Sequence, residues 1–206
     1  MYCDKVRLYH TRTLMKRCQW VPEHDEIYVH YHDTEWGVPV YDEHKLCEMF
    51  FLETFQAGLS WITILKKREN FRKAFDDFDP ELISKYDEVK FETLRNDAGI
   101  IRCRHKIKAA IKNAGILLKI REEYGSLVEY FWSFTDHQII VNQDDDIKTT
   151  SELSDRISKD LKKRGMSYVG SVTIYSFLQA VGIINDHHTT CFRYQELTHG
   201  KVESLR

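Results

Sequence analysis

Prolines and long apolar stretches are scarce in this 206-residue sequence, and each scarcity excludes a class of protein. Three prolines and nine glycines are too few for long flexible or proline-rich linkers. No apolar run approaches the roughly 20 residues that a membrane-spanning helix needs. The first residues, MYCDKVRLYHTRTLMKRC, also lack the apolar core of a signal peptide. We therefore expect no membrane segment, and a chain of this length fits one large domain or two closely packed lobes.

The cysteine count and the net charge bear on the cellular compartment and on nucleic-acid binding. Five cysteines, an odd number without a regular framework, fit a reducing compartment better than secretion, so we expect a cytoplasmic location. The net charge of −2 lacks the basic excess that marks many nucleic-acid-binding proteins. Basic islands nevertheless occur at residues 66–73, 102–108 and 159–165. Any one island fits a solvated helix face, whereas together they fit a small basic footprint on one side of the protein.

Most of the chain has the apolar spacing and the cap residues of helices, and no segment shows strand alternation. Asp79 followed by Pro80 is typical of a helix start. The apolar stretch 171–182 predicts a central, buried helix, and the polar stretch 141–150 predicts a connector. The predicted helices span residues 42–58, 59–75, 79–86, 104–125, 151–165 and 171–182. The predicted fold class is all-α.

Two residues near the C-terminus have the spacing of metal ligands. His187 and Cys191 lie one helical turn apart, so both side chains can point the same way. Such a pair supplies half of a tetrahedral zinc site, and Cys18 and His32 near the other end could complete a Cys₂His₂ set. With ten histidines and five cysteines, chance can also assemble such a quartet. From spacing alone, ordinary buried cysteines and hydrogen-bonded histidines are therefore the favoured interpretation.

A glycine-containing turn joins two predicted helices at LKKRGMSYVGS, residues 161–171. Gly165 and Gly170 allow a close approach of the backbone, and the helix that begins at Ser171 offers free N–H groups at its positive dipole end. With Arg164 beside the turn, this pattern fits a helix–hairpin–helix module that holds a DNA backbone. A plain connection between two helices fits the same residues equally well.

Aromatic residues crowd the N-terminal region and recur further along: Trp20, Tyr28, Tyr31, Trp36 and Trp61. Tyr28, Tyr31 and His32 share one face if their segment is helical, and grouped aromatics usually belong to the core. Glu53 is different, because a carboxylate inside the apolar helix 42–58 needs a partner. A carboxylate among aromatic rings would suit a flat, cationic guest that donates hydrogen bonds.

Several long motifs, in collinear order over about residues 17–194, carry a family resemblance. They read YHDTEWGVPVYD, QAGLSWITILKKRENFRKAF, DAGIIRCRHKI, YFWSFTDHQ, LKKRGMSYVG and NDHHTTCFRY. With these motifs the sequence resembles the DNA-3-methyladenine glycosylase I family, a branch of the helix–hairpin–helix glycosylases. The resemblance implies a two-lobed helical domain at 17–194, an N-terminal extension at 1–16 and a C-terminal tail at 195–206. For both terminal segments, disorder and a role as an interaction arm remain open.

The resemblance also implies a reaction and a metal. Enzymes of this family extrude 3-methyladenine from double-stranded DNA and hydrolyse its N-glycosidic bond. We see no lysine placed as a nucleophile, so strand cleavage is not expected, and we expect the protein to act as a monomer. One structural zinc ion is expected to join the N-terminal and C-terminal segments. Its ligands would be Cys18, His32, His187 and Cys191.

The same resemblance assigns further residues to the site. Glu53 and Tyr31 are expected to act on the base as the catalytic residues, in a pocket completed by Trp20, Tyr28 and Trp61. The loop that enters the DNA stack would comprise Gln56, Gly58 and Leu59. The residues expected to hold the DNA backbone are Arg164, Gly165, Gly170 and Ser171. Asp186 is a further candidate, since many helix–hairpin–helix glycosylases use an aspartate near this place.

Two rival functions fit parts of the sequence. NDHH resembles the Asp-His-His signature of a family of metal-dependent phosphoesterases. That family is α/β and needs several further metal-binding aspartates that follow strands, and no strands are visible in this sequence. The second rival keeps the fold and the zinc but is a non-catalytic protein that binds alkylated DNA. Glu53 and its aromatic companions favour the enzyme.

Overall fold

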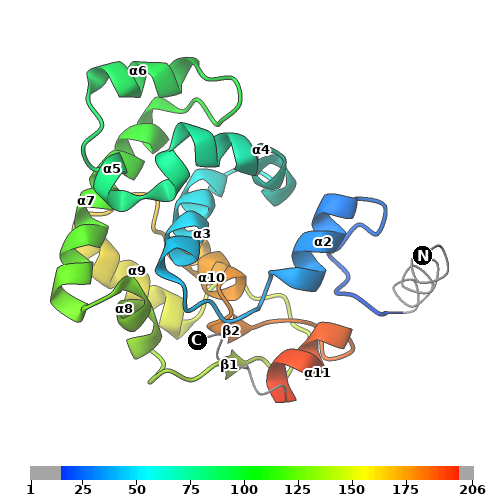
Figure 1. The fold of residues 1–206 in the computed structure, drawn as a ribbon. Helices are drawn as coiled ribbons and strands as arrows, with labels where there is room; N and C mark the ends of the chain where they lie inside the picture. The colour runs from blue at the N-terminus through cyan, green and yellow to red at the C-terminus, as the bar shows by residue number, and fades with distance from the viewer. Residues whose placement is uncertain (1–14, 200–206) are drawn as a thin grey trace, which may run out of the picture.

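The computed structural model describes residues 15–199, and the prediction of a mostly helical fold is confirmed (Figure 1). The expected extension 1–16 lies almost wholly outside the described residues, as does the end of the expected tail. The elements are α2 (Glu26–Thr34), α3 (Glu43–Gln56), α4 (Trp61–Ala74), η1 (Asp76–Phe78), α5 (Pro80–Ile83), α6 (Glu88–Asn96), α7 (Arg104–Tyr124), α8 (Leu127–Ser133), β1 (Ile140–Val141), α9 (Glu152–Lys163), α10 (Ser171–Ala180), β2 (Ile184–Asn185) and α11 (Phe192–His199).

Cap residues place several helix ends where the sequence predicts them. The Asp79 carboxylate accepts a hydrogen bond from the Glu81 amide, directly before Pro80 at the first position of α5. Ser151 and Ser154 form a reciprocal capping box at the start of α9. Gly125 ends α7 with a φ of 87°, which glycine adopts without strain.

Several elements differ from the sequence expectation. Helices α6 and α8 were not predicted, and α11 continues past Tyr194 into the expected tail. The expectation of no strands is wrong in one detail, because β1 pairs in parallel with β2, Ile140 opposite Ile184. A pair of two-residue strands is too short to show the alternation by which a strand is recognised.

Helix α3 lies at the centre of the molecule (Figure 1) and packs against α4, α7, α8 and α10. Every residue from Leu46 to Phe55 is buried, so the helix has no solvated face. Helix α10 is the second buried helix, as its apolar sequence predicts. Because α3 is apolar nearly all round, each carboxylate on it needs a specific reason to be there.

The start of the described chain meets the start of α11, on the side of the molecule where α2 also lies (Figure 1). The Phe192 amide donates to the Lys16 carbonyl at 3.0 Å. The Gly37 amide donates to the Gln179 carbonyl, also at 3.0 Å. Gly182 packs so closely that a Cβ there would lie 2.4 Å from the Val38 carbonyl carbon, so only glycine fits. This packing brings residues 16–40 against residues 179–192.

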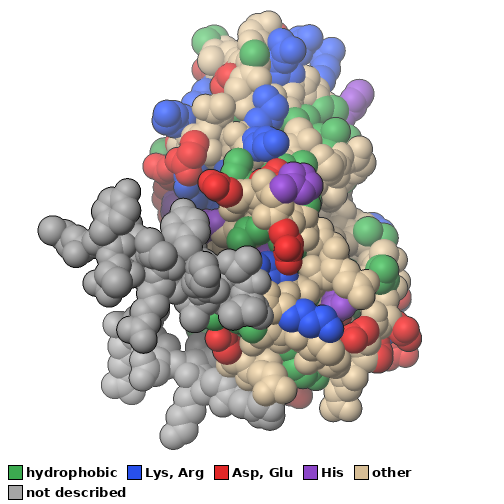
Figure 2. Space-filling view, turned by 90° about the vertical axis from the view of Figure 1, so that its right-hand side faces the viewer, with side chains coloured by type: hydrophobic (Ala, Val, Ile, Leu, Met, Phe, Trp, Pro, Cys, Tyr) green, Lys and Arg blue, Asp and Glu red, His purple; other side chains and the backbone are tan. Residues whose placement is uncertain are grey.

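Surface charge is unevenly distributed on the face that carries α2. Figure 2 shows basic side chains gathered toward the end where α4 and α6 lie, with acidic side chains scattered over the remainder. None of the helices in residues 15–199 combines the length and the apolar composition needed to cross a bilayer.

Candidate functional site

The four residues predicted as metal ligands converge in one buried cluster, although up to 173 positions separate them in the sequence. Their ligand atoms all lie within 4.8 Å of one another. The sulfur–nitrogen distances are 3.4 Å from Cys18 to His187, 3.5 Å from Cys191 to His32 and 3.6 Å from Cys191 to His187. In a tetrahedron around zinc, ordinary bond lengths place a sulfur and a nitrogen roughly 3.6 Å apart. The cluster therefore has the dimensions of a tetrahedral metal site.

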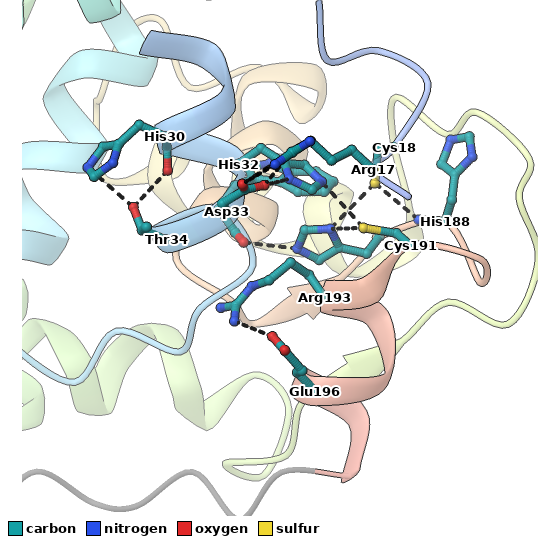
Figure 3. A network of polar contacts seen from close by, with 12 residues as sticks. Arg17, Cys18, His30, His32, Asp33, Thr34, His188, Cys191, Arg193 and Glu196 are labelled. Carbon is teal, nitrogen blue, oxygen red and sulfur yellow. Dashed lines mark hydrogen bonds and ion pairs between the residues drawn. The ribbon is translucent and has the colours of Figure 1, made fainter. Parts of the chain in front are cut away.

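Each histidine of the cluster is oriented through its other ring nitrogen, and Figure 3 shows this for His32. His32 Nδ1 bonds the Asp33 carboxylate at 2.8 Å, and Arg17 holds that carboxylate through two nitrogens. His187 Nε2 bonds the Trp36 carbonyl at 3.0 Å. These partners leave His32 Nε2 and His187 Nδ1 free to face the sulfurs, which is the arrangement that metal-bound histidines require. Burial lowers the pKa of His187, which favours the neutral, metal-binding form.

A pocket of about 230 Å³ lies next to the cluster, and α2 contributes to both. The sequence-predicted residues Trp20, Tyr28, Tyr31, Glu53 and Trp61 all line it. Aromatic contacts link the pocket to the cluster, because the Trp20 ring packs edge-on against both Tyr28 and His32. The structure therefore brings together the five residues expected to bind the base.

Glu53 is the one acidic side chain of this pocket. It is only 4% exposed, and among the described residues no cation or hydrogen-bond donor is placed against it. Burial alone raises the pKa of Glu53 to about 8. A guest that brings positive charge or N–H groups would favour the ionised carboxylate and supply the missing partner.

Two aromatic side chains frame Glu53. Tyr31 is fully buried, and its ring lies 5.4 Å from the Trp61 ring. Burial, reinforced by the nearby Glu53 charge, raises the pKa of Tyr31, so its phenol remains protonated. The indole nitrogen of Trp61 is buried and has no hydrogen-bond partner among the described residues. The pocket thus combines stacking surface with polar groups that the protein itself leaves unsatisfied.

The predicted loop residues follow α3 directly at the pocket mouth. Gln56 both lines the pocket and folds back, its side-chain amide donating to the Leu59 carbonyl at 2.6 Å. Gly58 has a φ of 79° with open space where a Cβ would stand. Leu59 exposes 37% of its apolar surface. Residues 56–60, which we term the pocket loop, therefore present an apolar tip outward next to the pocket.

Residues 164–170 form the turn between α9 and α10, at the position where the sequence predicts the hairpin. Gly165 has a φ of 96°. Gly170 is the N-cap residue of α10, and no side chain caps the first amides of this helix. Ser171 lies at the first turn of α10 and bonds the Ser154 hydroxyl. Arg164 is engaged within the protein, because its guanidinium pairs with Glu123 and Asp160. The hairpin therefore offers backbone amides more readily than the Arg164 charge.

Asp186 lies close to the pocket without lining it. Its carboxylate accepts hydrogen bonds from the side chains of Asn142, Tyr175 and Gln179. Three donors occupy the carboxylate, so Asp186 connects β2 with α10 and the segment after β1.

Three residues that line the pocket were not assigned to it from the sequence: Trp36, Ser176 and Gln179. Ser176 and Gln179 are three apart on the apolar helix α10, so they face the same way. Polar residues at that spacing in an otherwise apolar helix are the signal that could have indicated them. Their position opposite α2 depends on tertiary packing and is not readable from the sequence.

These features define a class of protein. It is mostly helical, and an aromatic pocket surrounds a buried carboxyl beside a Cys₂His₂ cluster. A profile of the methyladenine glycosylase family matches residues 20–194. The chain belongs to this family.

Two curated relatives resemble almost the whole chain. The Escherichia coli (strain K12) protein named DNA-3-methyladenine glycosylase 1 is 49% identical over 183 residues, which cover 87% of this chain and 97% of that protein. A Haemophilus influenzae protein named DNA-3-methyladenine glycosylase is 44% identical, with 85% of this chain and 96% of that protein covered.

Solved structures agree with the fold. A crystal structure of 3-methyladenine DNA glycosylase I superposes with a TM-score of 0.82 at 48% identity, covering 86% of this chain and 98% of that one. A variant of such an enzyme in complex with 3-methyladenine gives a TM-score of 0.82 at 36% identity, with 86% and 96% covered.

Proposed function

We propose that this protein is a base-excision DNA glycosylase that removes 3-methyladenine from alkylated DNA by hydrolysing its N-glycosidic bond. The relatives carry this name, and one solved neighbour was crystallised with 3-methyladenine. The observation in this chain that carries the proposal is Glu53, a carboxyl that is buried inside an aromatic pocket and has no partner within residues 15–199.

The chemistry of the substrate fits this pocket. In DNA, 3-methyladenine carries a positive charge, so its bond to the sugar is already weakened and the base leaves neutral. The enzyme then needs to bind and orient the base more than to protonate it. Tyr31 and Trp61 supply stacking surface, and the Glu53 carboxylate accepts from the edge N–H groups and stabilises the cation. Normal adenine is neutral and well paired, so it gains less from Glu53 and costs more to extrude.

The remaining assigned residues would serve double-stranded DNA. The pocket loop, with Gln56, Gly58 and Leu59, would fill the space that the extruded base leaves. The hairpin would hold the backbone through the amides near Gly165, Gly170 and Ser171, as in helix–hairpin–helix glycosylases. The Arg164 charge would contribute only if its ion pairs with Glu123 and Asp160 opened. A single chain contains all of these parts, which is consistent with a monomer.

Zinc is the metal that fits the Cys₂His₂ cluster. Two thiolates and two neutral imidazoles are ligands that zinc prefers, and four protein ligands close the coordination sphere without an open position for water. Such a zinc ion would be structural. It would fix α2 against the segment before α11 and so hold Tyr28 and Tyr31 in the pocket wall.

The test measures free base released from methylated duplex DNA by the wild type, Glu53→Gln and Tyr31→Ala, with the zinc content recorded for each. We expect wild type to release 3-methyladenine, and the two variants to lose most activity while each retains one zinc. Wild type that binds zinc and DNA but releases nothing would instead support the non-catalytic damage-binding protein.

A further inference from the structure

Helix α7 contacts both segments that are proposed to touch DNA, and no part of the function described so far uses these contacts. Lys106, in its first turn, donates from Nζ to the Phe55 carbonyl at 2.8 Å and to the Ala57 carbonyl at 2.6 Å. These carbonyls lie at the end of α3, where the backbone leaves the helix and enters the pocket loop. Carbonyls at a helix C-terminus have no partner within the helix, so Lys106 both caps α3 and fixes the direction of the loop.

Asn113, seven residues further along α7, binds the hairpin in the same way. Its side-chain amide donates to the Ser167 carbonyl at 2.9 Å and accepts from the Ser167 amide at 3.1 Å. Asn113 is fully buried, so this pair of hydrogen bonds is shielded from water. The next residue, Tyr168, has a φ of 60°, which is strained for a side-chain-bearing residue and persists only where neighbours hold it.

The spacing of the two anchors follows from helix geometry. Seven residues are two turns of an α-helix, so Lys106 and Asn113 lie on the same face, about 10 Å apart along the axis. Tyr168 completes the connection, because Lys106 Nζ lies 5.8 Å from the centre of its ring. One rigid helix face therefore holds the pocket loop at one point and the hairpin at another.

We propose that α7 sets the separation between the pocket loop and the hairpin, with Lys106 and Asn113 as positioning residues for duplex DNA. The inference rests on the proposed function, since it takes the pocket loop and the hairpin as the two DNA-contacting segments. A duplex must be held at its backbone and entered at one base step at the same time. Moving either segment relative to the other therefore weakens duplex binding and excision, while the pocket residues Tyr28, Tyr31 and Glu53, which lie on α2 and α3, keep their positions.

The test compares Lys106→Met with Lys119→Met, which removes the same charge from an exposed position further along α7. Two assays separate the pocket from the DNA-contacting segments. Binding of free 3-methyladenine, followed by tryptophan fluorescence, reports on the pocket alone. Binding of a duplex with a stable abasic-site analogue, together with base release from methylated duplex, reports on the positioning. For Lys106→Met we expect both duplex readouts to fall about tenfold, with the free-base affinity within about twofold of wild type.

Salt dependence distinguishes positioning from simple charge attraction. Loss of a phosphate contact weakens binding mostly at low salt, whereas loss of a positioning contact lowers affinity by a similar factor at low and high salt. We expect a salt-independent factor for Lys106→Met and a near-wild-type affinity for Lys119→Met. Asn113→Asp keeps the acceptor for the Ser167 amide but removes the donor, and it should reproduce the Lys106→Met pattern, with thermal unfolding recorded to confirm folding.

Three results would overturn the inference. Lys106→Met could match Lys119→Met in duplex binding, its deficit could vanish at high salt, or free-base affinity could fall together with duplex affinity. Failure of the proposed function is a separate result, in which wild type releases no base at all. The duplex-binding comparison still decides the role of α7 in that case, because it requires no catalysis.

Discussion

Helix α3 carries two carboxylates, Glu48 and Glu53, that are buried to the same degree but differ in their partners and in the direction of their pKa shifts. Glu48 is 3% exposed and Glu53 is 4% exposed. Arg68 and Arg72 both pair with Glu48, and although burial opposes it, these cations lower the pKa of Glu48. Glu53, five residues on, faces the aromatic pocket, and burial raises its pKa to about 8. The fold thus supplies cations for the buried carboxylate of Glu48, whereas residues 15–199 supply none for Glu53, where we propose that the base binds.

The largest change in stability should come from removing the Glu48 carboxylate, which is paired with two arginines. Among the described residues, Glu48→Gln leaves the buried Arg68 with Glu35 as its one remaining anionic partner, so we expect a loss of about 3 kcal/mol in the free energy of unfolding. Chemical denaturation measures it. The matched control is Glu69→Gln, which also removes a partner of Arg72 but from a side chain that is 72% exposed. That control should cost less than about 0.5 kcal/mol, and equal costs for the two variants would contradict the comparison.

Removing the Glu53 carboxylate should raise the free energy of unfolding instead of lowering it. The folded-state pKa of Glu53, about 8, lies above the unfolded value of 4.5. The stability that this carboxyl contributes is therefore fully present below about pH 4.5 and is lost as the pH rises through about 8. The stability of Glu53→Gln relative to wild type should rise by on the order of 2 kcal/mol between about pH 6 and about pH 9.

Thermal and chemical unfolding at several pH values test this second prediction. Glu48→Gln is the control, because the pKa of Glu48 is lowered, and a lowered pKa confines its pH dependence to acid conditions. Its effect should stay constant between neutral and alkaline pH. If Glu53→Gln showed an equally constant effect, the Glu53 carboxyl would not be protonated in the folded protein.

A third carboxylate, Asp33, extends the comparison to the metal cluster. Its partners are His32 and Arg17, so it is paired like Glu48, but it also orients the ring of His32, which we propose as a metal ligand. Asp33→Asn should lower metal affinity about 10- to 100-fold while the ligand set stays complete. Competition with a chelator measures the affinity. Glu26→Gln, an exposed change on the same helix, should leave it unchanged, and an unchanged affinity in Asp33→Asn would show that Asp33 does not support the metal.

The sequence predicts the fold well wherever a local signal defines an element. Asp79 with Pro80 begins a helix as expected, and the helices predicted over 104–125 and 151–165 end at Gly125 and begin at the Ser151–Ser154 capping box. Helix α8, with seven residues, and the two-residue strands β1 and β2 are too short for a periodic pattern. Their positions result from tertiary packing.

The site was only partly predictable for a related reason. In the sequence, Glu53 is notable as a carboxylate in an apolar helix, but Glu48, two positions after Leu46, is a carboxylate in the same apolar helix. Only the folded structure shows that arginines from α4 satisfy one and not the other. Ser176 and Gln179 enter the pocket from α10 across more than 100 residues of sequence, which no local pattern indicates.

The smallest predicted effect concerns the pH dependence of catalysis, and it tests what Glu53 does. If the carboxylate receives a cationic base, the free enzyme must first ionise Glu53. The kcat/KM on methylated duplex should then rise about tenfold per pH unit below about pH 8 and level off above it. Glu53→Gln should retain a low activity without this rise.

Metal content recorded at each pH separates this titration from loss of the cluster. The opposite profile, with kcat/KM falling above about pH 8, would mean that the protonated carboxyl is the active form. Glu53 would then donate to the base instead of stabilising its charge, and the pocket would select for hydrogen-bond pattern instead of for a cation. A carboxyl whose pKa is set by burial alone can serve either role, so the direction of this profile decides between them.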